Sequence, residues 1–253
     1  YTDDTNFDNV VLLLDGSSAT NDLSSADQDT SLTNHGTVTS DPVTGPPGYG
    51  TVNAMSFDGP SKFVTTSHYT ADLLNNDFTI EGWFRLDADQ SHNPYPPLFA
   101  FRQSGSGGVS DLYGVSLYIN EYSGLQHYWL SVGNGMNAHP WWILNINSTV
   151  SFSSGWQHMA VTRSGNTFRM FKDGTLIGSG TDNTPVTVTG DFTLMSGFSN
   201  GGGDYALGDV FDFRITEGVA RDIAADWTAG VYDSPMPQGP LLTRPTRRWG
   251  GIT

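Results

Sequence analysis

Two arginines near the end of the sequence have the spacing of a possible catalytic or ligand-binding pair. Arg214 lies in the alternating stretch FDFRIT, and Arg221 follows the turn signal Glu217-Gly218. A reaction would also need a nucleophile or a pair of carboxylates beside them, and the neighbouring sequence supplies neither. We therefore expect a structural clasp, in which Asp212 shares a strand face with Arg214 and can pair with it, and Arg221 caps or bridges the following turn.

Other patterns that carry catalysis or bind metals are missing from the sequence. The chain has no cysteine, which excludes disulfides and thiolate metal sites. None of the six histidines has H-x-H or H-E-x-x-H spacing, and no G-x-S-x-G motif presents a serine nucleophile. We expect His158, in the strand WQHMAV, to be packed and hydrogen-bonded rather than a ligand.

Aromatic residues are concentrated between positions 95 and 142. Sugar rings stack on exposed aromatic faces while amides bind their hydroxyls, and the loop GNGMNAHPWW offers both kinds of group. Adjacent strand residues point to opposite faces, so one tryptophan of the pair at 141 and 142 should face away from the core. Tyr118, Tyr128 and Trp129 are expected to fill the core. The candidate ligand-binding residues are Tyr95, Asn134, Asn137, Trp141 and Trp142.

The charge is negative and unevenly distributed. The chain has 26 acidic and 11 basic residues, for a net charge of −15. Phosphates would be repelled, which argues against nucleic acid as a partner, and no apolar run approaches the roughly 20 residues of a membrane span. Residues 241–253 contain no acid and three arginines. Because Arg and Trp are enriched at interface hot spots, we expect this tail to dock on a partner or neighbouring subunit through Arg244, Arg247, Arg248 and Trp249.

The elements that must position these residues are strands. DFTIEGWFRL (77–86) alternates, and Trp83 makes its second face apolar, so this strand should be central in a two-layer structure. In the closing strand, Phe211, Phe213 and Ile215 are expected to share one side. Hairpin turns are predicted at Gly165-Asn166 and Asp173-Gly174, and one short helix around 221–227.

About a dozen strands at regular spacing predict an all-β, two-sheet antiparallel jelly-roll sandwich. We expect one domain over residues 1–234. Three prolines at 235, 237 and 240 predict a stiff linker, so residues 235–253 form a separate linker and basic tail.

Three sequence blocks together resemble the concanavalin A-like, laminin G-type jelly roll, in the variant found in bacteriophage tail, fibre and other virion-associated proteins. The blocks are VVLLLDG, GWQHMAVTRSGNTFRMFKDGTLIG and FDFRITEGVARD. Members usually place two adjacent acids before the Arg-Ile of the closing strand, whereas this chain has Phe211 and Asp212 there. A role of the first acid in a cation site or polar network is therefore in doubt.

The resemblance implies two further possibilities for the site. Laminin G-type domains often bind one calcium ion at a loop rim, through carboxylates and backbone carbonyls. The candidate ligands expected here are Asp111 and Asp204, and the other candidate acids are Asp27, Asp29, Asp191 and Asp209. The fold also includes β-glucanases, which carry a Glu-x-Asp-x-(x)-Glu strand. No such string occurs, and Glu81 stands alone in TIEGWF. Retaining hydrolysis needs two carboxyls about 5 Å apart, so we expect no enzyme.

The sequence thus predicts a non-enzymatic structural or adhesion protein of a phage particle, which binds host-surface glycans, decorates the capsid or tail, or does both. Its expected partners are host-surface glycans and other virion subunits, in a homo-oligomeric assembly. Its location would be the virion. The alternatives are a secreted bacterial carbohydrate-binding module and, less in keeping with the sequence, a glycan hydrolase that uses loop acids.

Overall fold

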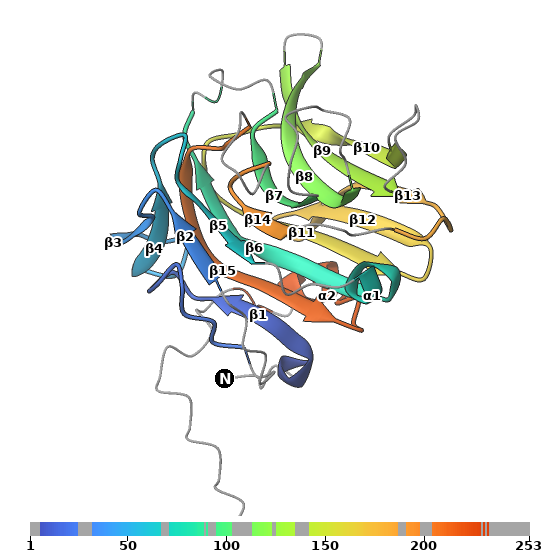
Figure 1. Ribbon diagram of the computed structural model, residues 1–253, viewed down its shortest axis with the longest axis horizontal. Helices are drawn as coiled ribbons and strands as arrows, with labels where there is room; N and C mark the ends of the chain where they lie inside the picture. The colour runs from blue at the N-terminus through green and yellow to red at the C-terminus, as the bar shows by residue number, and fades with distance from the viewer. Residues whose placement is uncertain are drawn as a thin grey trace, which may run out of the picture.

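The fold consists of two antiparallel sheets, which confirms the predicted all-β jelly-roll sandwich (Figure 1). The computed structural model describes residues 6–24, 32–66, 71–88, 90, 95–102, 113–122, 125–134, 142–186, 191–197, 204–228, 230 and 232. Within them lie eight strands of one sheet and seven of the other. No helix in these ranges is long and apolar enough to span a bilayer.

The eight-stranded sheet has the order β13-β12-β11-β6-β15-β4-β3, with β1 added beside β15. Its strands are β1 (Val10–Leu14), β3 (Thr39–Thr44), β4 (Thr51–Phe57), β6 (Phe78–Leu86), β11 (Gly155–Ser164), β12 (Thr167–Lys172), β13 (Thr175–Thr181) and β15 (Gly208–Glu217). The hairpins at Gly165-Asn166 and Asp173-Gly174 are confirmed, since these pairs join β11 to β12 and β12 to β13.

The seven-stranded sheet has the order β10-β9-β8-β7-β14-β5-β2. Its strands are β2 (Leu32–His35), β5 (Phe63–Thr66), β7 (Pro97–Arg102), β8 (Tyr113–Tyr122), β9 (Leu125–Asn134), β10 (Trp142–Ser151) and β14 (Asp191–Leu194). Three short helices complete the described structure: η1 (Phe7–Asn9), α1 (Ala71–Asn75) and α2 (Ile223–Thr228). The predicted helix near 221–227 is thus confirmed as α2.

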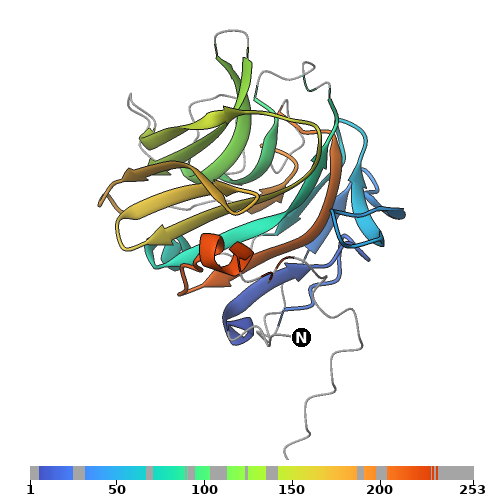
Figure 2. The same ribbon diagram turned by 180° about the vertical axis from the view of Figure 1, so that it is seen from behind.

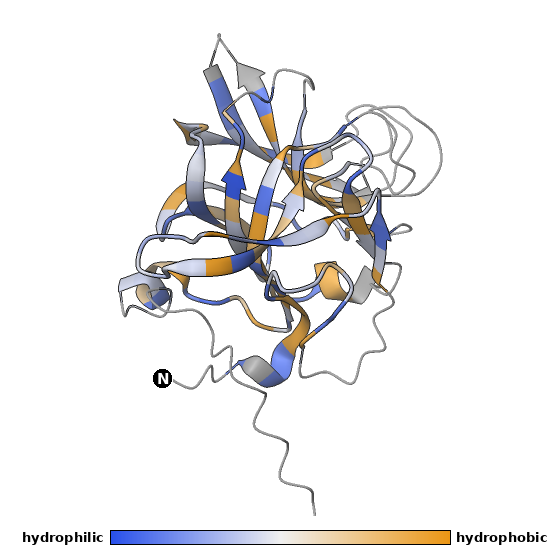
Figure 3. Cartoon of the chain, turned by 90° about the vertical axis from the view of Figure 1, so that its left-hand side faces the viewer, coloured by the Kyte–Doolittle hydropathy of each residue, from blue (hydrophilic) through white to orange (hydrophobic). Residues whose placement is uncertain are grey.

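The main hydrophobic core lies between the two sheets. Strand β6 contributes Phe78, Ile80 and Phe84 to it, and the facing sheet contributes residues such as Leu117 and Leu130. Hydrophobic and hydrophilic residues alternate along the strands, as the colouring of Figure 3 shows. This is the period of two that a strand with two different faces requires.

A second apolar cluster covers the outer face of the eight-stranded sheet. Trp83 and Phe211 belong to it, together with Ile223 of α2 and Tyr232. Seen from behind in Figure 2, α2 lies across this sheet. Strand β6 is therefore buried on both faces and central, between β11 and β15, as its sequence predicted.

The closing strand β15 contains a β-bulge that changes which residues face the core. It pairs with β4 through Gly208–Val210 and, on the same edge, with β1 through residues 213–216. Its register against β6 shifts between Phe211 and Arg214, where Asp212 has a φ of 48°. The prediction that Phe211 shares a side with Phe213 is wrong, because the extra residue sends Phe211 to the outer cluster.

Candidate functional site

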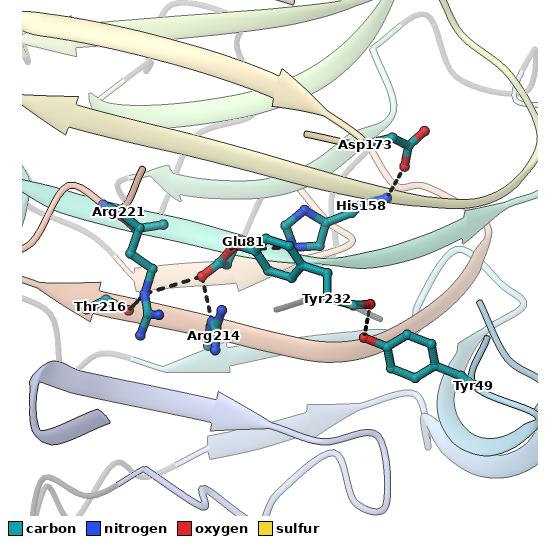
Figure 4. A network of polar contacts seen from close by, with 9 residues as sticks. Tyr49, Glu81, His158, Asp173, Arg214, Thr216, Arg221 and Tyr232 are labelled. Carbon is teal, nitrogen blue, oxygen red and sulfur yellow. Dashed lines mark hydrogen bonds and ion pairs between the residues drawn. The ribbon is translucent and has the colours of Figure 1, made fainter. Parts of the chain in front are cut away.

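A buried polar cluster lies under the last described segment of the chain, on the outer face of the eight-stranded sheet. We call Glu81, His158, Arg214, Arg221 and Tyr232 the Glu81 cluster. Glu81 and Arg214 are direct cross-strand partners of β6 and β15, because the bulge brings Arg214 into that register. Figure 4 shows the other side chains of the cluster converging on the Glu81 carboxylate from β11 and from the chain after β15.

Both oxygens of Glu81 have partners. Arg214 Nε lies 2.5 Å from Oε1, and Arg221 Nε lies 3.5 Å from the same atom. Tyr232 donates its hydroxyl to Oε2 at 2.7 Å, and His158 Nε2 lies 3.4 Å from Oε2. Glu81 itself is only 1% exposed, so all these contacts are made away from water.

The cluster keeps Glu81 ionised. Burial alone would raise the pKa of Glu81, but the charge of Arg214, the hydrogen bond with His158 and the charge of Arg221 together hold that pKa well below its usual range. The pKa of the Tyr232 hydroxyl is raised, first by burial and then by the charge of Glu81. Tyr232 therefore stays a neutral donor.

The cluster fastens the described chain that follows β15, in keeping with the clasp predicted for Arg214 and Arg221. The backbone N–H of Arg221 donates to Thr79 Oγ1 at 2.9 Å, and that hydroxyl donates to Val219 O. The carbonyl of Tyr232 accepts a 2.7 Å hydrogen bond from the Tyr49 hydroxyl (Figure 4). The partner expected for Arg214 needs correction, because the ion pair that anchors it is made with Glu81 rather than Asp212.

Asp212 occupies the bulge itself. Its Oδ1 is shielded from solvent and has no hydrogen-bond partner among the described residues. Burial, opposed by the charge of Arg214, raises the pKa of its carboxyl. The fold around Asp212 therefore disfavours the ionised form of its carboxyl.

The Glu81 cluster is not suited to catalysis. A buried carboxylate between two guanidinium groups can neither reach a substrate nor accept a proton near neutral pH. His158 is buried, with its ring tilted against Tyr232 and edge-on to Trp83, which confirms that it is a packed residue. The cluster holds the fold together, so the candidate site for a ligand lies elsewhere.

Three aromatic side chains are joined by successive ring contacts on the outer face of the seven-stranded sheet. Trp129 of β9 and Tyr118 of β8 are cross-strand partners, with ring centroids 6.3 Å apart and planes tilted by 35°. Tyr95, 38% exposed, stands at 81° to Tyr118 with 6.1 Å between centroids. We call these three residues the aromatic row.

Polar groups flank the aromatic row. Asn147 of β10, which is exposed, is the cross-strand partner of Trp129. Ser131 lies one outward position further along β9 and forms a 3.0 Å hydrogen bond with the Tyr118 hydroxyl; Asn145 is its neighbour across the ladder. Such a mixture of ring faces with a few placed amides and hydroxyls is typical of small-ligand and sugar sites.

Two ring nitrogens on this face have no hydrogen-bond partner among the described residues. They are Trp129 Nε1 and His127 Nδ1, and both atoms are shielded from solvent. Unpaired buried polar atoms are unusual in native proteins and call for an explanation. Trp129 belongs to the aromatic row, and His127 lies two residues before it on β9.

The described structure places only some of the predicted ligand-binding residues, so their grouping into one site stays a prediction. Tyr95 precedes β7 and lies beside Tyr118, whereas Asn134 ends β9 and Trp142 begins β10. Asn134 is five residues from Trp129, about 17 Å along a strand. Only backbone is described for Asn134 and Trp142, and Asn137 and Trp141 lie outside the described residues.

The remaining predicted sites are only partly within the described structure. Asp111 and the tail residues Arg244, Arg247, Arg248 and Trp249 lie outside it. Asp209 is paired with Arg85 at 2.7 Å rather than placed in a loop, and the carbonyl of Asp204 accepts a hydrogen bond from the N–H of Gly197. The described residues contain no group of three His, Cys, Asp or Glu that could hold a metal. Calcium therefore stays a prediction.

Sequence reasoning missed the central role of Glu81 and the outward position of Tyr118 and Trp129. Tyr128 does fill the core as expected, with no exposure, and donates its hydroxyl to Gln157. Trp129, its neighbour on the strand, must then face outward. Adjacent strand residues point to opposite faces, which is the reasoning used for Trp141 and Trp142. The same reasoning, applied to Tyr128 and Trp129, predicts the outward position of Trp129.

Similar folds occur in the binding domains of several clostridial toxins. The binding domain of paraclostridial mosquitocidal protein 1 aligns with a TM-score of 0.62 and 14% identity, over 88% of this chain and 52% of that one. The botulinum neurotoxin serotype D binding domain gives a TM-score of 0.62 at 11% identity, with the same coverage. A botulinum neurotoxin type C structure, concerned with cell entry through two ganglioside molecules, gives 0.59 at 14% identity, over 88% and 51%.

These likenesses show the fold, and this chain spans about half the length of the toxin structures. No curated protein sequence matches the chain. The family model described as the concanavalin A-like lectin/glucanases superfamily matches residues 58–221, which is more than half of the 253 residues. The chain therefore belongs to the concanavalin A-like lectin/glucanase superfamily.

Proposed function

We propose that this protein is a non-enzymatic adhesion module that binds glycans on the outer face of its seven-stranded sheet. The observation that carries the proposal is the aromatic row, in which Tyr95, Tyr118 and Trp129 lie within 6.3 Å of their neighbours between ring centroids. Aromatic rings provide large contact areas with a polar edge, which suits a ligand with both apolar and hydroxylated surfaces.

The polar neighbours complete such a site. Asn147 and Asn145 each carry an amide, which is both a donor and an acceptor and so can bind a sugar hydroxyl in either sense. The fold supports the proposal only generally, since one fold can have many functions. Among the similar structures, the binding domain of botulinum neurotoxin DC is in complex with SialylT, and the botulinum neurotoxin type C structure concerns interaction with two ganglioside molecules. Those are ligands of the toxins, and they suggest sugars as the class to test here.

We further place the module on a bacteriophage particle, where it adheres to host-surface glycans. The support is the resemblance of the three sequence blocks to virion-associated proteins. In this setting the basic tail at 241–253 docks on another subunit, and calcium binds at a loop rim. Deletion of 241–253 should then abolish assembly on the particle or self-association in sedimentation. A secreted carbohydrate-binding module would keep its monomeric state and its glycan binding after the same deletion.

A glycan array, probed with and without calcium, tests glycan binding directly. We expect binding, and loss of about 2 kcal/mol, or about 30-fold in affinity, in Trp129→Ala. Trp156→Ala is the matched control, because Trp156 is a half-buried tryptophan on the outer face of the other sheet. Asn147→Ala, at an exposed position, should weaken binding without affecting folding. A blank array in both conditions, or equal losses in the Trp129 and Trp156 variants, would overturn the proposal.

A further inference from the structure

We infer that the glycans bound at the aromatic row are neutral, and that the protein selects against glycans carrying carboxylate or sulfate groups. This inference rests on the proposed function and adds the charge of the ligand to it. Three observations carry it: the lack of basic side chains at the row, the position of the nearest arginine in this sheet, and the net charge of the molecule.

Among the described residues, the outer face around the aromatic row presents no lysine or arginine that could bind an anionic sugar. Its described side chains are aromatic, amide or hydroxyl groups, with the imidazole of His127. The seven strands of this sheet contain one arginine, Arg102, and no lysine. Recognition of carboxylate, phosphate or sulfate normally relies on Arg or Lys, since their charged hydrogen bonds are about twice as strong as neutral ones.

Arg102 is badly placed to serve the row. Tyr118 pairs with Pro97, which is five residues, or about 17 Å, from Arg102 along β7. The backbone partner of Arg102 on β14 is Asp191. Asp191 precedes the core residue Phe192, so by alternation it lies on the outer face, and it adds negative charge there.

The charge of the whole molecule acts in the same direction. The net charge is −15, and the tail at 241–253 carries three of the 11 basic residues, so the rest of the chain is more acidic than the total. A potential of this sign lowers the local concentration of anions and slows their association. A neutral glycan experiences neither effect. The hydroxyls of a neutral sugar also match the amides of Asn145 and Asn147, which can donate and accept.

Pairs of related glycans, in which one member carries anionic groups and the other does not, test the inference. The immobilised 253-residue chain is titrated with hydroxyethylcellulose and carboxymethylcellulose, with dextran and dextran sulfate, and with asialo and sialylated N-glycans. We expect the strongest binder to be neutral, and its anionic counterpart to bind at least about tenfold more weakly at about 0.01 M salt. The gap should narrow at about 0.15 M salt, where the Debye length falls from about 30 Å to about 8 Å.

A charge added at the row should change the preference. Asn147→Lys introduces a cation beside Trp129, and we expect it to raise the ratio of anionic to neutral affinity several-fold at low salt. Asn147→Gln, without charge, is the control and should leave that ratio unchanged. Since Asn147 is exposed, both variants should fold like the parent protein.

The possible outcomes separate this inference from the proposed function. If an anionic polymer binds most tightly and Trp129→Ala abolishes that binding, the glycan site stands and the inference of neutrality is overturned. If none of the polymers binds and the glycan array is blank, both fail. An unchanged ratio in Asn147→Lys would also count against the inference, because the added charge would then lie outside the site.

Discussion

The buried charge of Glu81 is stabilised by residues outside its own strand. It is an acid at a fully buried position of a central strand, where an unpaired charge would cost several kcal/mol. Arg214, Arg221 and the Tyr232 hydroxyl offset that cost by direct contact. Removal of Glu81 therefore leaves both guanidinium groups buried without their shared anion.

Glu81→Gln should destabilise the protein by about 3–5 kcal/mol, because two buried guanidinium groups lose their anion. Chemical denaturation at neutral pH measures the change in the free energy of unfolding. Asp58→Asn is the control, since Asp58 forms an ion pair with Lys62 at the surface and should cost less than about 1 kcal/mol. Similar losses in the two variants would contradict a structural role of the Glu81 cluster.

The stability difference between the parent protein and Glu81→Gln should change with pH in one direction. The folded pKa of Glu81 lies below its unfolded value of 4.5, so its stabilising contribution is present above about pH 4.5 and is lost as the pH falls towards the folded pKa. The gap between parent and Glu81→Gln should therefore be constant near neutral pH and should shrink in acid. A gap that grows in acid would contradict the assignment.

At the scale of elements, the close packing of α2 against the sheet requires a glycine in a hairpin turn. Gly174, between β12 and β13, has a φ of 72°, and a Cβ there would lie 2.2 Å from Cγ of Trp227 in α2. Trp227 in turn contacts Trp83, His158 and Tyr232. The close approach of this ring thus depends on the absence of a side chain at the turn.

Gly174→Ala should loosen α2 and destabilise the protein by more than about 1 kcal/mol, through backbone strain and a clash with the indole. Hydrogen exchange over residues 223–228 and thermal unfolding measure the effect. Gly165→Ala is a matched control, because Gly165 is also a hairpin glycine with positive φ, at 57°, but nothing lies within 4 Å of the added Cβ. If α2 exchanged equally in both variants, the clash would play no part.

At the scale of the whole molecule, the negative charge is large and the cations available to offset it are few. Twenty-six acids face 11 basic residues, and two of the arginines, Arg214 and Arg221, are committed to the buried Glu81 cluster. The remaining acids repel one another across the surface. Such self-repulsion destabilises the compact state and depends on ionic strength.

Added sodium chloride should therefore raise the thermal midpoint by a few degrees between about 0.01 M and about 0.1 M, as the Debye length falls from about 30 Å to about 10 Å. Differential scanning calorimetry measures the shift, and sucrose at equal osmolality serves as the control. A midpoint that falls with salt would mean that favourable ion pairs outweigh the repulsion between acids.

The sequence by itself determined the class of fold, the central strand β6, the two hairpin turns and the short helix α2. Each of these depends on a local pattern, such as alternation along β6 or a glycine at a turn, which neighbouring residues specify by themselves.

Only the tertiary structure decided the bulge at Asp212, the partners of Glu81 and the aromatic row. The bulge is defined by the pairing of β15 with β6, whose register shifts between Phe211 and Arg214. Tyr232 reaches Glu81 across 151 positions of sequence, and Trp129 meets Tyr118 and Asn147 only through strand register. Contacts between residues so far apart depend on how the strands pair in space, which no single stretch of the chain specifies.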